Sequence, residues 1–293
     1  MTKALEGKTA LVTGGAGGIG AASALALARD GAAVALMGRR RDALEAARKS
    51  MGEAVPGATI EICVGDACRD EDVRAALQQA WGVRERLDIV VPTVGGGGFR
   101  PMLMHDAASF MAEIELNIAS AFLAIRHAAP LMAPHGGSIV CISSAAARVN
   151  FRWLAAYCAA KAGLEAFVRG AAEELAEANI RVNAVRPGLT RSGATDPMFD
   201  NPAVLDLFVA QMPLGRAGEP GDIAAAVRYL AGPESGWVTG QSFAVDGGNE
   251  LRSNPKLDGA IAAMYGEAAL RDVLAGRIPA SGSAGNTTNG DQQ

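Results

Sequence analysis

The sequence of 293 residues is poor in side chains that bind metals or form disulfide bridges. It has four cysteines and three histidines, no two cysteines form a CxxC pair, and the histidines do not cluster with the cysteines. Neither a disulfide framework nor a zinc site is indicated, and no metal is expected. The cysteines are expected to be buried reduced thiols.

An excess of charge of one sign is also absent. The formal net charge is -4, and only 20% of the residues are charged. The chain therefore has no strong basic field to attract nucleic acid or an anionic membrane. It shows neither the pattern of a secretory signal nor an apolar stretch that we interpret as a membrane span. We expect a cytoplasmic protein without nucleic-acid or membrane partners.

Apolar strand-like segments alternate with helical patterns along most of the chain. The expected strands are 9–14, 32–37, 58–65, 87–95, 137–144, 180–188 and 241–248, and the expected helices are 19–30, 40–51, 69–81, 106–132, 153–178, 202–211 and 220–231. Continuous apolar strands in repeated βα units are typical of a parallel sheet covered on both faces. The sequence predicts an α/β, single-domain Rossmann-type fold, in which a doubly wound parallel sheet of about seven strands is flanked by helices.

Two segments interrupt the alternation. Residues 189–218 are rich in turn formers interleaved with Met and Phe, and a loop of this length in a compact domain is usually functional. The dinucleotide-binding catalytic domain is expected to span residues 1–250, followed by an extension, 251–293. In that extension, 256–275 is expected to be helical and 279–293 disordered.

The glycine-rich segment TGGAGGIG, residues 13–20, joins the first expected strand to the first helix. Glycines at this position let the backbone approach a pyrophosphate, which the helix N-terminus holds with its N–H groups and dipole. An ordinary tight turn is the alternative, but the placement between strand and helix favours dinucleotide binding. The expected contacts are Gly14, Ala16, Gly18, Ile19 and Gly20.

The end of the second strand bears on the choice of dinucleotide. NAD-binding proteins usually have an acidic residue there, whereas this chain has Gly38, Arg39 and Arg40. Guanidinium groups can bind a 2′-phosphate, so NADP(H) is preferred over NAD(H), although arginines at a helix start can also be solvated surface. Asp66, followed by Ala67, could cap the next helix or hold the adenine amino group.

Tyr157 and Lys161 are four residues apart, which places them on one face of a helix. An ammonium beside a phenol favours the phenolate and is expected to lower its pKa from about 10. Such a tyrosine can exchange a proton with an alcohol or a carbonyl. Random placement of three tyrosines and five lysines gives roughly 0.05 expected matches to YxxxK, so chance is a poor explanation.

Over residues 5–250 the chain resembles the classical short-chain dehydrogenase/reductase family. The motifs that carry the resemblance are TGxxxGxG at Thr13, Gly14, Gly18 and Gly20, YxxxK at Tyr157 and Lys161, a serine thirteen residues earlier at Ser144, a helix asparagine at Asn117, the Pro187–Gly188 turn and Asp246–Gly247–Gly248. The family's NNAG motif is replaced here by Pro92, Thr93, Val94 and Gly95, which changes how that strand is tied to its neighbours.

The resemblance implies roles for four catalytic residues. Tyr157 would be the general acid or base, Ser144 would orient the substrate oxygen, Lys161 would hold the nicotinamide ribose, and Asn117 would hold a water of a proton relay. The structural alternatives are that Ser144 only caps a turn and that Asn117 only satisfies a buried backbone group. The remaining cofactor contacts expected are Thr93, Gly95, Pro187, Gly188 and Leu189, together with Tyr157 and Lys161.

Apolar side chains near the expected site predict a hydrophobic substrate. The substrate-binding candidates are Ser144, Phe99, Phe151, Trp153, Met198 and Phe199, with Met102, Leu189 and Met212 as further wall candidates. Packing in the core explains any one of them equally well. Two explanations for the glycines at 95–98 are equally good: they allow close approach of a bulky ligand, or they form a mobile loop.

The sequence therefore predicts an NAD(P)-dependent oxidoreductase that interconverts a hydrophobic ketone and a secondary alcohol. One alternative is a reductase of the C=C bond of an enoyl or dienoyl thioester, and another is a non-catalytic NADP-sensing protein. The resemblance also implies a homo-oligomer, commonly a tetramer. The extension is expected to cover a neighbour's active site.

Overall fold

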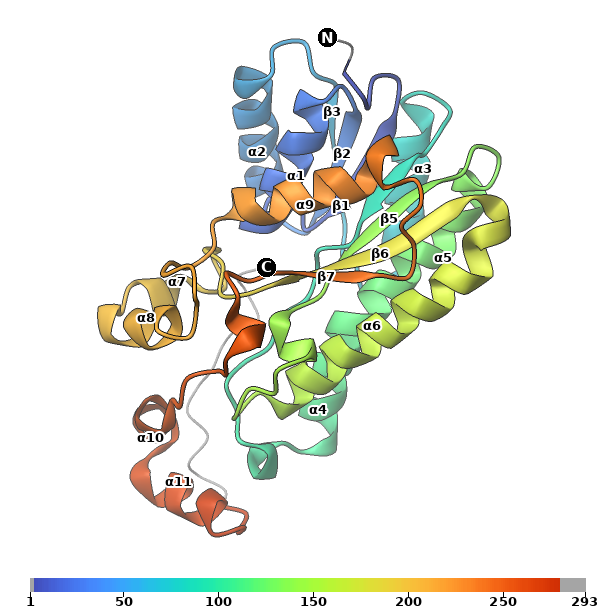
Figure 1. The fold of residues 1–293 in the computed structure, drawn as a ribbon. Coiled ribbons are helices and arrows are strands. Elements are labelled where there is room, and N and C mark those ends of the chain that lie inside the picture. Colours follow the sequence, from blue (N-terminus) through green and yellow to red (C-terminus); the bar gives the residue numbers. More distant parts are fainter. Residues whose placement is uncertain (1–2, 280–293) are drawn as a thin grey trace.

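A seven-stranded parallel sheet forms the centre of the computed structural model, which describes residues 3–279 (Figure 1). The strands are β1 (Thr9–Thr13), β2 (Ala33–Gly38), β3 (Ile60–Val64), β4 (Ile89–Val91), β5 (Gly137–Ile142), β6 (Ile180–Pro187) and β7 (Ser242–Val245). They lie in the order β3-β2-β1-β4-β5-β6-β7. The predicted doubly wound fold is confirmed, and the order reverses between β1 and β4, where such sheets bind ligands at the carboxyl ends of their strands.

Helices cover both faces of the sheet. The α-helices of the described residues are α1 (Gly18–Arg29), α2 (Arg41–Ala54), α3 (Asp70–Gly82), α4 (Ala107–Ile114), α5 (Ser120–Met132), α6 (Ala155–Leu175), α7 (Asp196–Phe199), α8 (Pro202–Val209), α9 (Pro220–Ala231), α10 (Asp258–Tyr265) and α11 (Glu267–Leu274). Of these, α7, α8, α10 and α11 lie away from the sheet (Figure 1). Alternate residues of each strand face opposite sides. In β1, Val12 packs with α1, α2 and α9, and Leu11 packs with α3, α5 and α6 (Figure 1).

The helix predicted over 106–132 is interrupted. A π-helical turn, Glu115–Ala119, separates α4 from α5. By length and composition the whole run Ala107–Met132 could cross a membrane, contrary to the sequence interpretation. In this fold, however, Ala121, Ala124 and Ile125 of α5 pack against the sheet, as core helices do.

The fourth strand is shorter than predicted, three residues instead of nine. Pro92 follows directly and lacks the N–H that a further ladder bond needs. Thr93 supplies a side-chain connection in its place. Its Oγ1 donates to Thr13 O (2.5 Å), and its backbone N–H donates to Thr13 Oγ1 (3.1 Å).

The C-terminal extension consists of two short helices rather than one. Gly266, at φ +90°, separates α10 from α11 and reverses the chain. The hairpin packs against its own chain, beside α4 and the loops at the carboxyl edge of the sheet (Figure 1). The disorder predicted for 279–293 concerns residues that, apart from Pro279, lie outside the described range.

Candidate active site

The loop between β1 and α1 is shaped by glycines that no larger residue could replace. Gly14 has φ +62°, and a Cβ on Gly20 would lie 2.2 Å from Gly14 O. The N-cap of α1 is Gly17, which has no side chain to cap the first N–H groups of the helix. These donors and the positive end of the helix dipole suit the pyrophosphate of a dinucleotide.

A cavity of about 490 Å³, here the adenosine cavity, opens beside this loop. Its lining includes Gly14, Gly38, Arg39, Asp66, Ala67, Cys68, Val94, Gly98, Phe99, Arg100, Glu113, Leu116 and Tyr265. Arg40 is exposed at the N-cap of α2 and does not line it. The Asp66 carboxylate accepts the Cys68 N–H (2.9 Å), so Asp66 stabilises the turn before α3 and also lines the cavity.

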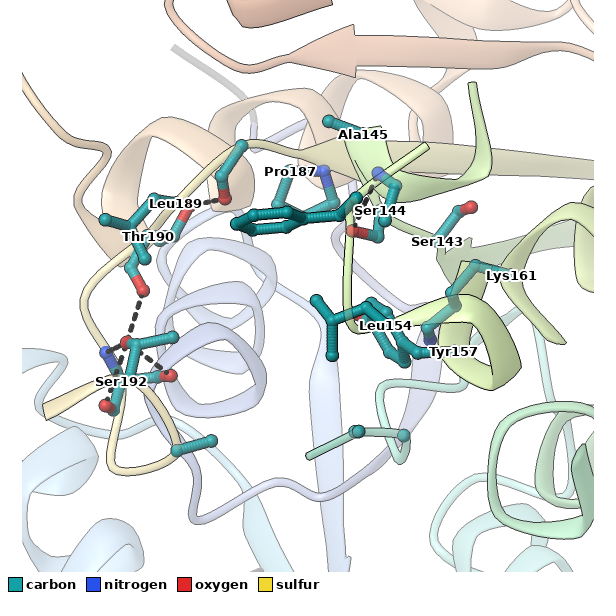
Figure 2. Close-up of a pocket in the computed structure, with 18 of the residues that line it drawn as sticks. Ser143, Ser144, Ala145, Leu154, Tyr157, Lys161, Pro187, Leu189, Thr190 and Ser192 are labelled. Atoms are coloured by element: carbon teal, nitrogen blue, oxygen red, sulfur yellow. Dashed lines mark hydrogen bonds between the residues drawn. The ribbon is translucent and has the colours of Figure 1, made fainter. Parts of the chain in front are cut away.

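A second cavity of about 230 Å³, here the catalytic cavity, lies where β4, β5 and β6 end (Figure 2). Its lining includes Ile19, Thr93, Gly95, Gly96, Gly97, Phe99, Ser143, Ser144, Phe151, Leu154, Tyr157, Lys161, Pro187, Gly188, Leu189, Thr190, Ser192, Met198, Phe208, Asn249 and Asn254. Both cavities share Gly96, Gly97 and Phe99, so they adjoin. Of the residues expected to contact the cofactor, Ala16, Gly18, Gly20 and Arg40 line neither.

Tyr157 and Lys161 lie one turn apart on α6, and Ser144 faces them from the end of β5 (Figure 2). Ser144 lies beside Tyr157 and acts to lower its pKa, and the Ser144 Oγ accepts the Ala146 N–H (3.2 Å). Lys161 is buried, and its Nζ donates to Ile142 O (2.9 Å) and lies 5.7 Å from the centroid of the Tyr157 ring. The three side chains that the sequence predicts as a unit are thus brought together.

The protonation states differ from the sequence expectation. Burial raises the pKa of Tyr157, and the hydrogen bond with Ser144 offsets this only in part. Burial also lowers the pKa of Lys161 to about 8. The expectation that Lys161 brings the pKa of the phenol below its usual value is therefore wrong for the protein alone, because desolvation disfavours both charged forms.

Asn117 lies in the π-helical turn, and its carboxamide holds the glycine loop, residues 95–98. Its Nδ2 donates to Gly96 O (2.7 Å) and Glu113 O (2.8 Å), and its Oδ1 accepts the Gly96 N–H (3.0 Å). A Cβ on Gly95 would lie 2.6 Å from that Oδ1, so the close approach requires glycine. The side chain clamps the loop; its part in a water relay stays a prediction.

The glycine loop continues over Tyr157. A Cβ on Gly97 would lie 2.7 Å from the Cβ and Cδ2 atoms of Tyr157. The glycines thus allow the loop to approach protein side chains closely, and the two predicted alternatives, close approach of a bulky ligand and a mobile loop, both stay predictions.

Phe99, Phe151 and Met198 form the predicted apolar wall. The rings of Phe99 and Phe151 meet edge to face at 5.2 Å. Trp153 does not line the cavity, because it is buried against α10 and α11 instead. Phe199 is also outside it and lies under the Arg191 guanidinium, 4.3 Å from the ring centroid.

Met102 and Met212 also lie outside the lining of both cavities. Met102 is exposed, and Met212 is buried beneath Gly247.

Several site residues are not predicted by the sequence analysis. Leu154 and Phe208 complete the apolar wall, and Thr190 and Ser192 add hydroxyls near the Pro187–Gly188 turn. Glu165 is buried beneath the site, where its Oε1 accepts hydrogen bonds from Ser143 (2.9 Å) and Ser242 (2.8 Å). Its position four residues after Lys161, on the same helix face, is the sequence signal that could have found it.

Comparisons with known proteins agree with this geometry. The family model described as Enoyl-(Acyl carrier protein) reductase matches residues 14–250. An uncharacterized oxidoreductase of Mycobacterium tuberculosis is 37% identical over 246 residues, covering 83% of this chain and 92% of its own. A short-chain type dehydrogenase/reductase from Mycobacterium ulcerans has a TM-score of 0.87 at 32% identity, covering 92% of this chain and 98% of its own. The chain belongs to the short-chain dehydrogenase/reductase family.

As a short-chain dehydrogenase/reductase, the protein is an oxidoreductase that acts on CH–OH or C=O groups with NAD(P). One solved structure similar to it is a 7 alpha-hydroxysteroid dehydrogenase complexed with NADH and 7-oxo glycochenodeoxycholic acid. It has a TM-score of 0.81 at 32% identity and covers 87% of this chain and 98% of its own. A dinucleotide of this kind fits the present short-chain dehydrogenase/reductase, because the glycine-rich loop between β1 and α1 leaves room for it and the N-terminus of α1 has no side-chain cap.

Proposed function

We propose that this protein interconverts a hydrophobic ketone and a secondary alcohol, with Tyr157 as general acid or base and NADP(H) as the preferred cofactor. The observation that carries the proposal is that Ser144, Tyr157 and Lys161 line one largely apolar cavity, with the Lys161 Nζ 5.7 Å from the centroid of the Tyr157 ring. A carbonyl oxygen bound there meets two hydroxyl groups on one side and aromatic walls on the other.

The dinucleotide supplies or accepts the hydride. The protein supplies the rest of the reaction. Ser144 donates a hydrogen bond to the carbonyl oxygen and orients it, and Tyr157 transfers its phenolic proton to that oxygen as negative charge develops. In the direction of oxidation Tyr157 must instead accept the proton of the alcohol, which requires the phenolate. Lys161, when protonated, stabilises that phenolate.

The decisive experiment compares the wild-type protein with Tyr157→Phe. The expected result is a loss of NADPH-dependent ketone reduction by at least about a hundredfold, the scale of a general acid, with NADPH binding retained. Binding is measured by fluorescence titration of NADPH, so that a folding defect is recognised. Unchanged turnover in Tyr157→Phe would contradict the mechanism. NADPH binding by the wild-type protein without turnover of any ketone or alcohol would instead favour the alternative in which the protein only senses NADP.

The preference for NADP(H) rests on Arg39, which lines the adenosine cavity, and on the lack of an acidic residue at the end of β2. Arg39→Ala should raise the KM for NADPH by roughly tenfold, the worth of one charge-assisted hydrogen bond, and leave the KM for NADH nearly unchanged. Arg40→Ala is the matched control, since Arg40 lies outside the cavity. A preference for NADH in the wild-type protein would contradict this part of the proposal.

The aromatic wall supports a bulky, hydrophobic substrate. Phe99, Phe151 and Phe208 form a chain of edge-to-face contacts at 5.2 and 5.6 Å. The similar hydroxysteroid dehydrogenase binds a steroid ketone, which is consistent with this class. Cyclic and steroid ketones should give a higher kcat/KM than short polar ketones with the same cofactor.

Reduction of a C=C bond is the second candidate. The description of the matching family model names an enoyl reductase, and residues 92–95, just before the glycine loop, depart from the family's NNAG motif. The presence of both Ser144 and Tyr157 in the lining of the cavity favours the carbonyl reaction. Turnover of an enoyl or dienoyl thioester, with none of any ketone, would reverse this choice.

The proposed assembly is a cytoplasmic homotetramer. Phe110, Met111 and Phe122 are exposed apolar side chains on α4 and α5, and a partner subunit would cover them. Light scattering coupled to size-exclusion chromatography tests the assembly, and a monomer would contradict it.

A further inference from the structure

The α10–α11 hairpin follows the residues that the family model matches, 14–250. It nevertheless shares a buried cluster with the loops of the active site. Ile261, Tyr265 and Leu270 of the hairpin pack against Trp153, and Phe99 joins the same cluster from the end of the glycine loop. The hairpin thus forms part of its own subunit's site, whereas the sequence analysis assigned it to a neighbour's.

Asp258, the first residue of α10, fixes the segment that precedes α6. Its Oδ1 accepts the indole N–H of Trp153 (3.0 Å), and its Oδ2 accepts the Arg152 guanidinium (2.9 Å). Trp153 has φ +75°, a conformation that a bulky residue adopts only when its surroundings hold it there. Asp258 and the buried cluster provide those surroundings.

The constrained tryptophan in turn holds the end of the glycine loop. Trp153 O accepts the Arg100 N–H (2.7 Å), and the Tyr265 hydroxyl donates to Phe99 O (2.8 Å). Two successive residues of the loop are therefore anchored to the hairpin, one directly and one through Trp153. Two residues earlier, Gly97 lies against the ring of Tyr157.

We propose that Asp258 and Tyr265 are positioning residues, which hold the glycine loop against Tyr157 and place Phe99 in the substrate wall. The consequence for substrates rests on the proposed function: the hairpin sets the depth of the cavity for a bulky ketone. When the anchors are lost, the loop moves off the phenol, water reaches it, and Phe99 no longer packs against the substrate.

The first test does not depend on a substrate. Hydrogen exchange of the Arg100 amide is compared among the wild-type protein, Asp258→Ala, Tyr265→Phe and the control Asp272→Asn. Asp272 lies on α11 and pairs with Arg277 at 2.8 Å, away from the anchors. Loss of one anchoring bond should speed exchange at Arg100 roughly tenfold in the first two variants and leave the control unchanged.

The second test titrates the phenol by its ultraviolet absorbance, as the difference between each variant and the same variant carrying Tyr157→Phe. The groups that face Tyr157 are Ser144, Cys158 and Lys161, with Glu113 across from α4. Burial raises the pKa of Tyr157, so its midpoint should move to lower pH in Asp258→Ala and Tyr265→Phe. A purely structural hairpin would not move it.

The third test is kinetic and uses NADPH with a steroid ketone and with cyclohexanone. Asp258→Ala should lower kcat/KM for the steroid ketone about tenfold and that for cyclohexanone less. Asp258→Asn, which keeps an acceptor for the Trp153 indole, should recover most of the loss.

The outcomes separate the two proposals. Unchanged exchange and an unchanged midpoint in both Asp258→Ala and Tyr265→Phe would overturn the positioning role, whatever the enzyme reduces. Tyr265→Phe removes a single hydroxyl, so it decides the question even if Asp258→Ala does not fold. If exchange and midpoint shift while the wild-type protein reduces no ketone, the positioning role stands and the proposed substrate class fails.

Discussion

Replacing Lys161 with methionine tests whether burial of the charged amine lowers the free energy of unfolding of the protein. Burial lowers the pKa of Lys161 from 10.5 to about 8. At about 1.4 kcal/mol per pKa unit, the folded protein loses about 3 kcal/mol of stability by keeping the side chain charged. The side chain is 2% exposed, so solvent screening does little to reduce this amount.

The sign of the effect follows from the protons that each state binds. Below about pH 8 the folded and unfolded states both hold the proton, and the penalty is complete. Between about pH 8 and 10.5 only the unfolded state holds it, so the stability contributed by this site rises with pH. Above 10.5 neither state is charged, and the penalty is gone.

Urea unfolding of the wild-type protein and of Lys161→Met, at about pH 7 and about pH 9.5, measures this difference. The free energy of unfolding of the wild-type protein should rise by about 2 kcal/mol relative to the variant between these values. The comparison cancels the altered packing and the lost bond to Ile142 O, which are equal at both pH values. Lys49→Met, on the exposed side of α2, is the control. If the difference in free energy of unfolding between the wild-type protein and Lys161→Met does not change with pH, the reasoning is refuted.

Two further predictions concern the glycine loop and its attachment. Gly97→Ala should lower kcat at least about tenfold, because its Cβ would lie 2.7 Å from the Tyr157 ring; Gly82→Ala, which meets no atom within 4 Å, is the kinetic control. Equal kcat values would contradict this. Thr93→Val should lower the free energy of unfolding by about 1–3 kcal/mol, measured in urea, because Thr13 O loses its donor. A change below about 0.5 kcal/mol would show that the hydroxyl bond to Thr13 does not tie β4 to β1.

The positions of the strands could be predicted because a parallel sheet buried on both faces requires continuous apolar segments. Val90 and Val140, for example, are fully buried, and both lie in such segments. The spacing of Ser144, Tyr157 and Lys161 likewise placed them in one site, since a helix turn and a strand end fix their positions.

What the sequence could not supply depends on contacts between distant segments. Trp153 looks like a substrate contact because it lies close to Tyr157 in the sequence, but Asp258, 105 residues away, draws its indole to the hairpin. The pKa of Tyr157 was misjudged for a related reason. A helical spacing shows which charge is near, whereas the depth of burial depends on the loop that passes over the ring.

The π-helical turn between α4 and α5 contains one residue more than a regular turn would. Each residue of an α-helix advances the side-chain direction by about 100°. Deleting a single residue from Glu115–Ala119 would therefore restore a continuous helix and rotate α4 by about that angle relative to α5. The Asn117 side chain could then no longer bond both Gly96 and Glu113 O. The clamp on the glycine loop therefore depends on the one additional residue of this turn, and a one-residue deletion there should abolish it.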